Sequence, residues 1–173
     1  MIFKKAKVSD AARIADAMKK IHALLDDPDL YVTDTEEDLR TFIDGTHGFA
    51  LLAMEEDAMA GYFIIRFPET DEDHHLGDFI GLEEEEKKLV VYMDSSGVFP
   101  EFRGQRLQNR MLTECERILA ETPYRHALST ISPDNPASLQ SLIRNGFEVV
   151  KTVSIYGGLT RNILYKDLKK AVD

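Results

Sequence analysis

Cysteine is nearly absent from the sequence: Cys115 is the only one among 173 residues. A single cysteine cannot form an internal disulfide and cannot build a cysteine cluster for a metal ion. His74 and His75 stand in a polar stretch without a second group of ligand-type residues, so we expect no metal site. Cys115 falls on the apolar side of a predicted helix, and we expect it in the core rather than as a nucleophile.

Positive charge is also scarce, with 21 Lys and Arg against 31 Asp and Glu and a net charge of −10. Proteins that hold the phosphate backbone of DNA or RNA need clustered Lys and Arg. The charge balance therefore argues against a nucleic-acid partner, and a cationic small molecule suits it better.

Long apolar runs are missing as well, and no segment is long enough to span a bilayer. The first residues, MIFKKAKVSDAAR, lack the apolar block and small-residue cleavage site of a signal peptide. We therefore expect a cytoplasmic protein with no membrane partner.

The residues that are present predict a single domain over residues 1–173, because neither repeats nor low-complexity linkers interrupt the chain. Apolar residues at helical spacing predict helices from about residue 10, over about 104–121 and over 135–146, and a capping-box pattern from Thr35 to Asp38 predicts a short one between the first two. Strand-like runs lie at 2–7, in two halves of a hairpin within 48–67, and at 88–99, 126–132, 147–156 and 160–167. Residues 69–88 are expected to be a loop with one helical turn.

The resulting order, β-α-α-β-β-β-α-β-α-β-β, predicts an α/β (α+β) fold with a mixed central sheet and helices on both faces.

The segment VFPEFRGQRLQNRML, residues 98–112, runs from a strand through a turn into an amphipathic helix. A helix N-terminus presents unpaired N–H groups and partial positive charge, so it attracts an anion such as a phosphate. Gly104 would let the backbone approach closely, and Arg103 and Arg106 add formal charge. The alternative is an Arg-Gly turn that simply starts a surface helix.

A second segment, SPDNPASLQSLIRNGFEVV at 132–150, places Asn135 after a strand and closes its helix with Asn-Gly-Phe. Together the two segments resemble the GNAT N-acetyltransferase superfamily over residues 89–150. The resemblance implies a mostly antiparallel GNAT-type sheet and acetyl-CoA as co-substrate. It also implies a cofactor site in which Val98 contacts the pantetheine arm through its main chain, Asn135 lies on the other side of a splayed strand pair, and the pyrophosphate is held by Arg103, Gly104, Gln105, Arg106, Leu107, Gln108 and Asn109.

The turn departs from the family pattern, because Arg106 and Gln108 stand where glycines are usual. The resemblance implies that backbone N–H groups hold the phosphate, and any residue except proline supplies one. The Arg106 side chain could grip a phosphate as a charged donor, or it could obstruct the approach that glycine permits. Leu142 stands where many members have a tyrosine that protonates the leaving thiolate.

Two residues are candidates for the catalytic work. Asp94 lies within an apolar strand, where a carboxylate is costly unless it is paired or functional. We expect it to act as general base or to bind the acceptor ammonium; the alternative is a structural partner of a nearby backbone or basic group. Regular strand geometry puts Asp94, Ser96 and Val98 on one face and Ser95 on the other, and a bulge near Gly97 would change this. Tyr156 could reach the cleft as an acid, or be an ordinary strand aromatic.

These features predict an enzyme that transfers an acetyl group directly from acetyl-CoA to a primary amine, either a small amine or a peptide amine. The alternative is a catalytically weak or inactive acyl-CoA-binding regulatory module, which Leu142 and the altered turn would explain. A homodimer is possible, as in many members of the superfamily.

Overall fold

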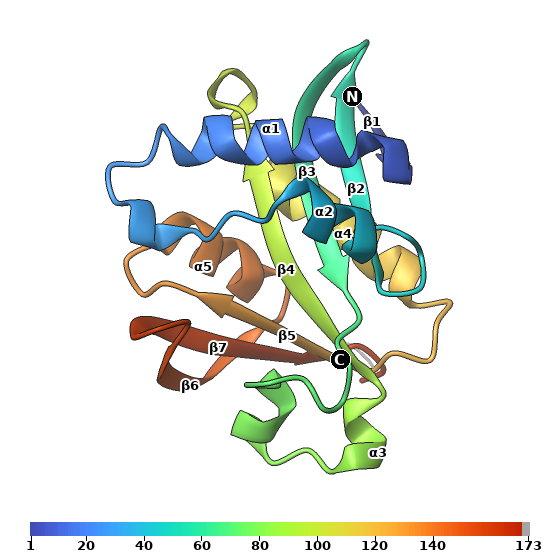
Figure 1. Cartoon of the computed structure of the whole chain (residues 1–173), viewed down its shortest axis with the longest axis vertical. Coiled ribbons are helices and arrows are strands. Elements are labelled where there is room, and N and C mark those ends of the chain that lie inside the picture. The colour runs from blue at the N-terminus through green and yellow to red at the C-terminus, as the bar shows by residue number, and fades with distance from the viewer. Residues whose placement is uncertain (171–173) are drawn as a thin grey trace.

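A computed structural model describes residues 1–170 and contains one seven-stranded sheet, in the order β1-β2-β3-β4-β5-β7-β6 (Figure 1). The strands are β1 (Ile2–Lys5), β2 (Gly48–Glu55), β3 (Ala58–Arg66), β4 (Val90–Val98), β5 (His126–Ile131), β6 (Glu148–Ile155) and β7 (Leu159–Asp167). Neighbouring strands are antiparallel except β4 and β5, which are parallel. The prediction of a mixed, mostly antiparallel sheet is therefore confirmed.

Helices cover both faces of the sheet, as predicted. They are α1 (Ala11–His22), α2 (Glu36–Phe42), α3 (Glu84–Lys87), α4 (Leu107–Leu119) and α5 (Pro136–Arg144). Helices α1 and α2 share a core cluster with one face of β2 and β3, whereas α4 packs with the opposite face. Leu51 accordingly packs with Met111 of α4, and its neighbour Leu52 packs with Ile14 of α1. This alternation explains why β2 and β3 are buried almost throughout.

The parallel pair β4 and β5 separates soon after it begins. Backbone pairing runs from Val90 with His126 to Tyr92 with Leu128 and goes no further, although β4 continues to Val98. Figure 1 shows the two strands running apart, with α5 beside the opening. The unpaired end of β4 therefore faces an opening in the sheet rather than a neighbouring strand.

Two local predictions need correction. Helix α4 begins at Leu107 rather than near residue 104, because residues 103–106 form a turn that contains left-handed backbone. The segment 69–88 holds two helical turns, a 3-10 turn at Leu76–Ile80 and α3, and its His75 is fully buried. The capping box at Thr35 is confirmed, since the Thr35 hydroxyl accepts the Asp38 N–H at 3.1 Å.

Candidate active site

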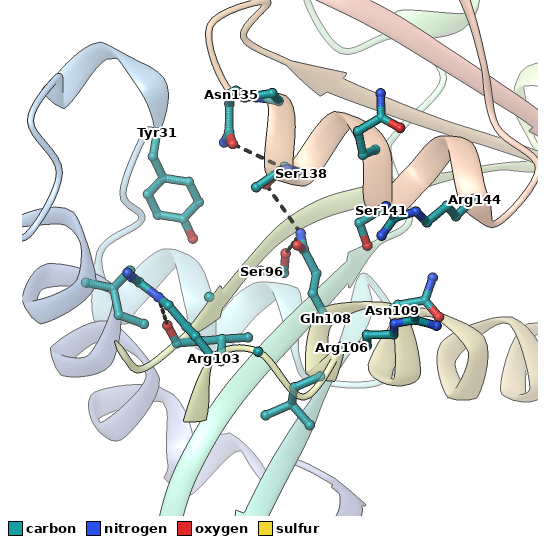
Figure 2. A pocket seen from close by; sticks show the side chains of 18 of the residues that line it. Tyr31, Ser96, Arg103, Arg106, Gln108, Asn109, Asn135, Ser138, Ser141 and Arg144 are labelled. Atoms are coloured by element: carbon teal, nitrogen blue, oxygen red, sulfur yellow. Dashed lines mark hydrogen bonds between the residues drawn. The ribbon is translucent and has the colours of Figure 1, made fainter. Parts of the chain in front are cut away.

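A cleft of about 1030 Å³ lies beside the unpaired end of β4. It is bounded by the end of β4, the turn before α4, and the first turns of α4 and α5 (Figure 2). Of the residues predicted to hold the cofactor, those that line the cleft are Val98, Arg103, Gly104, Arg106, Leu107, Gln108, Asn109 and Asn135. Gln105 is exposed and does not line it. The fold thus brings two distant sequence segments to one cavity.

The turn before α4 keeps a glycine-like backbone. Gly104 has φ 80° and Arg106 has φ 53°, so both lie in the left-handed region. An L-residue other than glycine pays about 1–2 kcal/mol for that conformation. Arg106 is also the N-cap of α4 and makes no side-chain hydrogen bond to the helix. Arg106 therefore leaves the first N–H groups of the 13-residue helix α4 uncapped. These N–H groups lie at the cleft and carry partial positive charge.

Arginines give this end of the cleft its charge. Arg103, Arg106 and Arg144 all line it, in a protein of net charge −10. Arg103 Nε donates to the carbonyl of Val98 at 3.3 Å, so that carbonyl, expected to face the pantetheine arm, already accepts a hydrogen bond. The cleft is a local basic region suited to an anion.

Gln108 reaches across the opening. Its amide nitrogen donates to the Ser96 hydroxyl of β4 at 2.8 Å and lies 3.5 Å from the Ser138 hydroxyl of α5 (Figure 2). Asn135 caps α5, because its side-chain oxygen accepts the Ser138 N–H at 3.3 Å, and it lines the cleft at the same time. A glycine at this position could not make this bridge across the cleft.

A second, smaller pocket of about 280 Å³ adjoins the cleft. Both predicted catalytic residues, Asp94 and Tyr156, line it. Tyr31, from the loop after α1, lines both the pocket and the cleft. Tyr31 therefore marks the junction of the two cavities.

A β-bulge decides which way the β4 side chains point. Ile64 pairs with Ser95 and Ile65 pairs with Met93, which leaves Asp94 as the extra residue. Asp94 and Ser95 consequently both line the smaller pocket, while Ser96 lines the cleft. Regular alternation would put Asp94 on the face of Ser96 and Val98, but it does not hold here, because the strand has a bulge, at Asp94 itself rather than near Gly97.

The smaller pocket contains a chain of charged groups. Arg66 Nε lies 3.4 Å from Asp94 Oδ1, and its terminal nitrogens donate to both oxygens of Glu72 at 2.9 and 3.1 Å. Burial raises the pKa of Asp94 above its ordinary value, and the Arg66 charge opposes that shift. Burial and the nearby Asp94 raise the pKa of Asp34 to about 7. Asp34 and Asp94 thus share one pocket, and the positive charge of Arg66 compensates their negative charge only in part.

Two tyrosines flank these carboxyl groups. The Tyr31 hydroxyl lies 2.6 Å from the hydroxyl of fully buried Tyr62, and burial raises the pKa of Tyr31 to about 12. Tyr31 therefore keeps its proton at neutral pH. The Tyr156 hydroxyl lies 3.2 Å from the Thr130 hydroxyl, and its backbone is left-handed with φ 54°.

Sequence reasoning missed Tyr31 and Asp34. Both stand between two helices in a stretch without apolar periodicity, and no motif marks them. The one available signal was the capping box at Thr35, which fixed where the helix starts but not what the preceding loop contacts.

Cys115 lies where the helical pattern put it. Cys115 is fully buried among the residues of α4 and the sheet, and burial raises the pKa of its thiol, so the prediction of a core residue is confirmed. Leu142, at the usual tyrosine position, is buried in the same cluster. Within residues 1–170, no group of three or more His, Cys, Asp or Glu could hold a metal ion, and no helix there is long and apolar enough to cross a membrane.

Comparison with solved structures identifies the fold. The chain superposes on Arabidopsis thaliana NAA60 in complex with acetyl-CoA with a TM-score of 0.77 at 14% identity, covering 98% of this chain and 99% of that one. It superposes on yncA of Salmonella typhimurium, described as a putative acetyltransferase with its cofactor acetyl-CoA, with a TM-score of 0.70 at 18% identity and coverage of 100% and 96%. For the ribosomal-protein-S18-alanine N-acetyltransferase of Escherichia coli the TM-score is 0.73 at 12% identity, with coverage of 99% and 96%.

The family follows from the sequence. The model of the acetyltransferase (GNAT) family matches residues 18–147, so the chain belongs to this family. No curated protein matches at the level of sequence. Enzymes of the family use acetyl-CoA as co-substrate, and the matched residues include both segments that line the cleft.

Proposed function

We propose that the protein transfers an acetyl group directly from acetyl-CoA to a primary amine, without a covalent enzyme intermediate. The observation that carries the proposal is the pair of adjoining cavities: a basic cleft at the N-terminus of α4 and a carboxylate-containing pocket, which meet at Tyr31. The basic cleft suits a thioester carrier with phosphates, and the smaller pocket with its carboxylates suits a cationic acceptor.

The cleft is the proposed acetyl-CoA site. The left-handed residues Gly104 and Arg106 support this, because they give the turn the backbone that glycines give it in the family pattern. The first N–H groups of α4 and the side chains of Arg103 and Arg106 would hold the phosphates, and Val98 and Asn135 would flank the pantetheine arm.

The smaller pocket is the proposed acceptor site. Asp34 and Asp94 would bind the ammonium and accept its proton, and the pKa of Asp34 near 7 suits that transfer at neutral pH. The amine nitrogen then attacks the thioester carbon, a C–N bond forms and the C–S bond breaks. Tyr31 gives its proton to the departing thiolate. The ammonium loses two protons in all: one leaves to water through the carboxylates, and the other restores Tyr31.

Tyr156 is assigned to the acceptor side. It lines only the smaller pocket, whereas Tyr31 lines both cavities, so Tyr31 is the better-placed acid. A cytoplasmic location stays a prediction, as does a homodimer. The exposed Val149 and Val150 on the edge strand β6 offer the surface on which to look for one.

A regulatory module that binds acyl-CoA without turnover is the second candidate. The Gln108 bridge across the cleft favours it, together with the absence of a tyrosine at position 142. Release of free CoA thiol from acetyl-CoA, measured across amines, peptides and polyamines, separates the two. An enzyme shows amine-dependent release, and Asp94→Asn lowers kcat far more than it weakens acetyl-CoA binding. A module binds CoA and releases no thiol with any amine.

A further inference from the structure

Besides Arg66, the smaller pocket contains a second arginine, and no carboxylate of the described residues 1–170 pairs with it. Arg161, at the start of β7, lines the pocket although it is only 5% exposed. Its terminal nitrogens donate to the backbone carbonyls of Asp29 and Thr160. Among residues 1–170 no carboxylate lies within 4 Å of it, in contrast to Arg66, which holds both Glu72 and Asp94.

A buried guanidinium with only carbonyl partners is incompletely satisfied. Arginine carries five N–H donors in a planar fork, and the backbone contacts of Arg161 use one on each terminal nitrogen. Burying a cation is costly unless a counter-charge accompanies it. The group that best matches a free guanidinium edge is a carboxylate, which can accept two parallel hydrogen bonds.

The opposite charge gathers elsewhere in the same pocket. Burial and the nearby Asp94 disfavour ionisation of Asp34, and Arg66 is shared between Asp94 and Glu72. A ligand ammonium would relieve that repulsion. The pocket therefore offers an anionic site for an ammonium and a cationic site for a carboxylate.

The contacts of Arg161 also limit the size of the acceptor. Its bond to the carbonyl of Asp29 joins the loop after α1 to the β6–β7 hairpin, and these two segments both line the pocket. The volume of about 280 Å³ lies just below the range of about 300–1,000 Å³ usual for ligand pockets. An extended peptide would need the two segments to part, whereas a single amino acid would not.

We propose that the acceptor is a free amino acid, held with its ammonium at Asp34 and Asp94 and its carboxylate at Arg161. The inference rests on the proposed function and specifies its substrate class. The remaining walls include Leu30, Val32 and Phe42, which suit an apolar side chain. The reaction keeps the balance given above, and the carboxylate of the acceptor takes no part in bond making.

The test is a matched series of acceptors: leucine, leucinamide, and 3-methylbutylamine, which is leucine without its carboxylate. Thiol release from acetyl-CoA gives kcat/KM for each. We expect leucine to exceed both analogues by roughly tenfold or more, the loss that follows when a buried charged group is left without its hydrogen-bond partner. Glycine with glycinamide, and phenylalanine with phenylalaninamide, repeat the comparison for other side-chain sizes.

Arg161 variants give the second readout. Arg161→Gln should bring the acid-to-amide ratio close to one, and Arg161→Lys should keep part of it, because lysine retains the charge without the fork. A purely structural role would lower both rates and leave the ratio unchanged. If either variant fails to fold, the wild-type ratio alone decides.

Two results would overturn the inference in distinguishable ways. Thiol release that is as fast with the amides, or that occurs only with peptides or spermidine, refutes the amino-acid acceptor and leaves the proposed function standing. No thiol release with any amine refutes the proposed function, and the acceptor assignment with it.

Discussion

Arg106 provides the most direct structural prediction, because a glycine should be more stable than the native residue at this position. Its φ of 53° costs an L-residue about 1–2 kcal/mol, whereas glycine adopts it freely. Glycine also loses about 0.5–1 kcal/mol more backbone entropy on folding. The net expectation for Arg106→Gly is a gain of up to about 1.5 kcal/mol, which raises the Tm of a chain of this size by up to about 6 °C.

Thermal unfolding followed by circular dichroism measures this gain. The matched control is Arg103→Gly, which removes the same charge from the same turn at an ordinary φ of −68°. The control also loses the hydrogen bond to Val98, so its Tm should fall. If Arg106→Gly lowered the Tm as much as the control does, the left-handed turn would be the wrong description of this segment.

Three further predictions concern the two cavities. Tyr31→Phe should lower kcat about 100-fold, since proton donation contributes at least that factor, while the Kd for acetyl-CoA changes little. Tyr156→Phe should lower kcat less. Equal losses of kcat in the two variants would refute the assignment of Tyr31 as the acid. Gln108→Ala should tighten acetyl-CoA binding about 2- to 10-fold in calorimetry. The reason is that binding would no longer compete with the Gln108–Ser96 hydrogen bond, which is worth about 0.5–1.5 kcal/mol. Weaker binding by the variant would mean that Gln108 holds the cofactor. The pKa of Asp34 is raised from 3.8 to about 7, so the folded state binds more protons than the unfolded state between those pH values and stability falls as pH rises through this window. Between pH 5 and pH 8, the free energy of unfolding measured in urea should therefore fall less for Asp34→Asn than for the wild type. If Asp34 is the base, kcat/KM of the wild type rises with pH near 7, and this rise should disappear in the variant. An unchanged pH profile of kcat/KM would exclude Asp34 as the base.

The sequence was most informative where a periodic pattern decides burial. Cys115 lies in the core because its helix places it on an apolar face, and the pattern states that face directly. The strand and helix order also followed from local patterns, including the hairpin of β2 and β3.

The pattern failed where tertiary pairing overrides the local period. Asp94 sits in a bulge that only its pairing with β3 defines, so strict alternation assigned it to the wrong face. Tyr31 and Asp34 reach the pocket from a loop whose path is fixed by distant contacts, such as the Tyr31–Tyr62 hydrogen bond. Side chains that meet in this way leave no mark in the sequence near them.

Local sequence patterns also did not predict the left-handed backbone of Arg106. Few L-residues adopt it, so local preference argues against it, and the surrounding structure must enforce it. The family pattern, in which glycine is usual there, was the indirect sign.

The central claim is that the cleft beside α4 binds acetyl-CoA through the turn that contains Gly104, and a calorimetric titration tests it most directly. The wild type is compared with Gly104→Pro, which removes an N–H and forbids φ 80°, and with Gly81→Pro, which imposes the same change at φ 74° outside both cavities. We expect micromolar binding by the wild type and by Gly81→Pro, and none by Gly104→Pro. Absence of binding by the wild type, or undiminished binding by Gly104→Pro, would contradict the account.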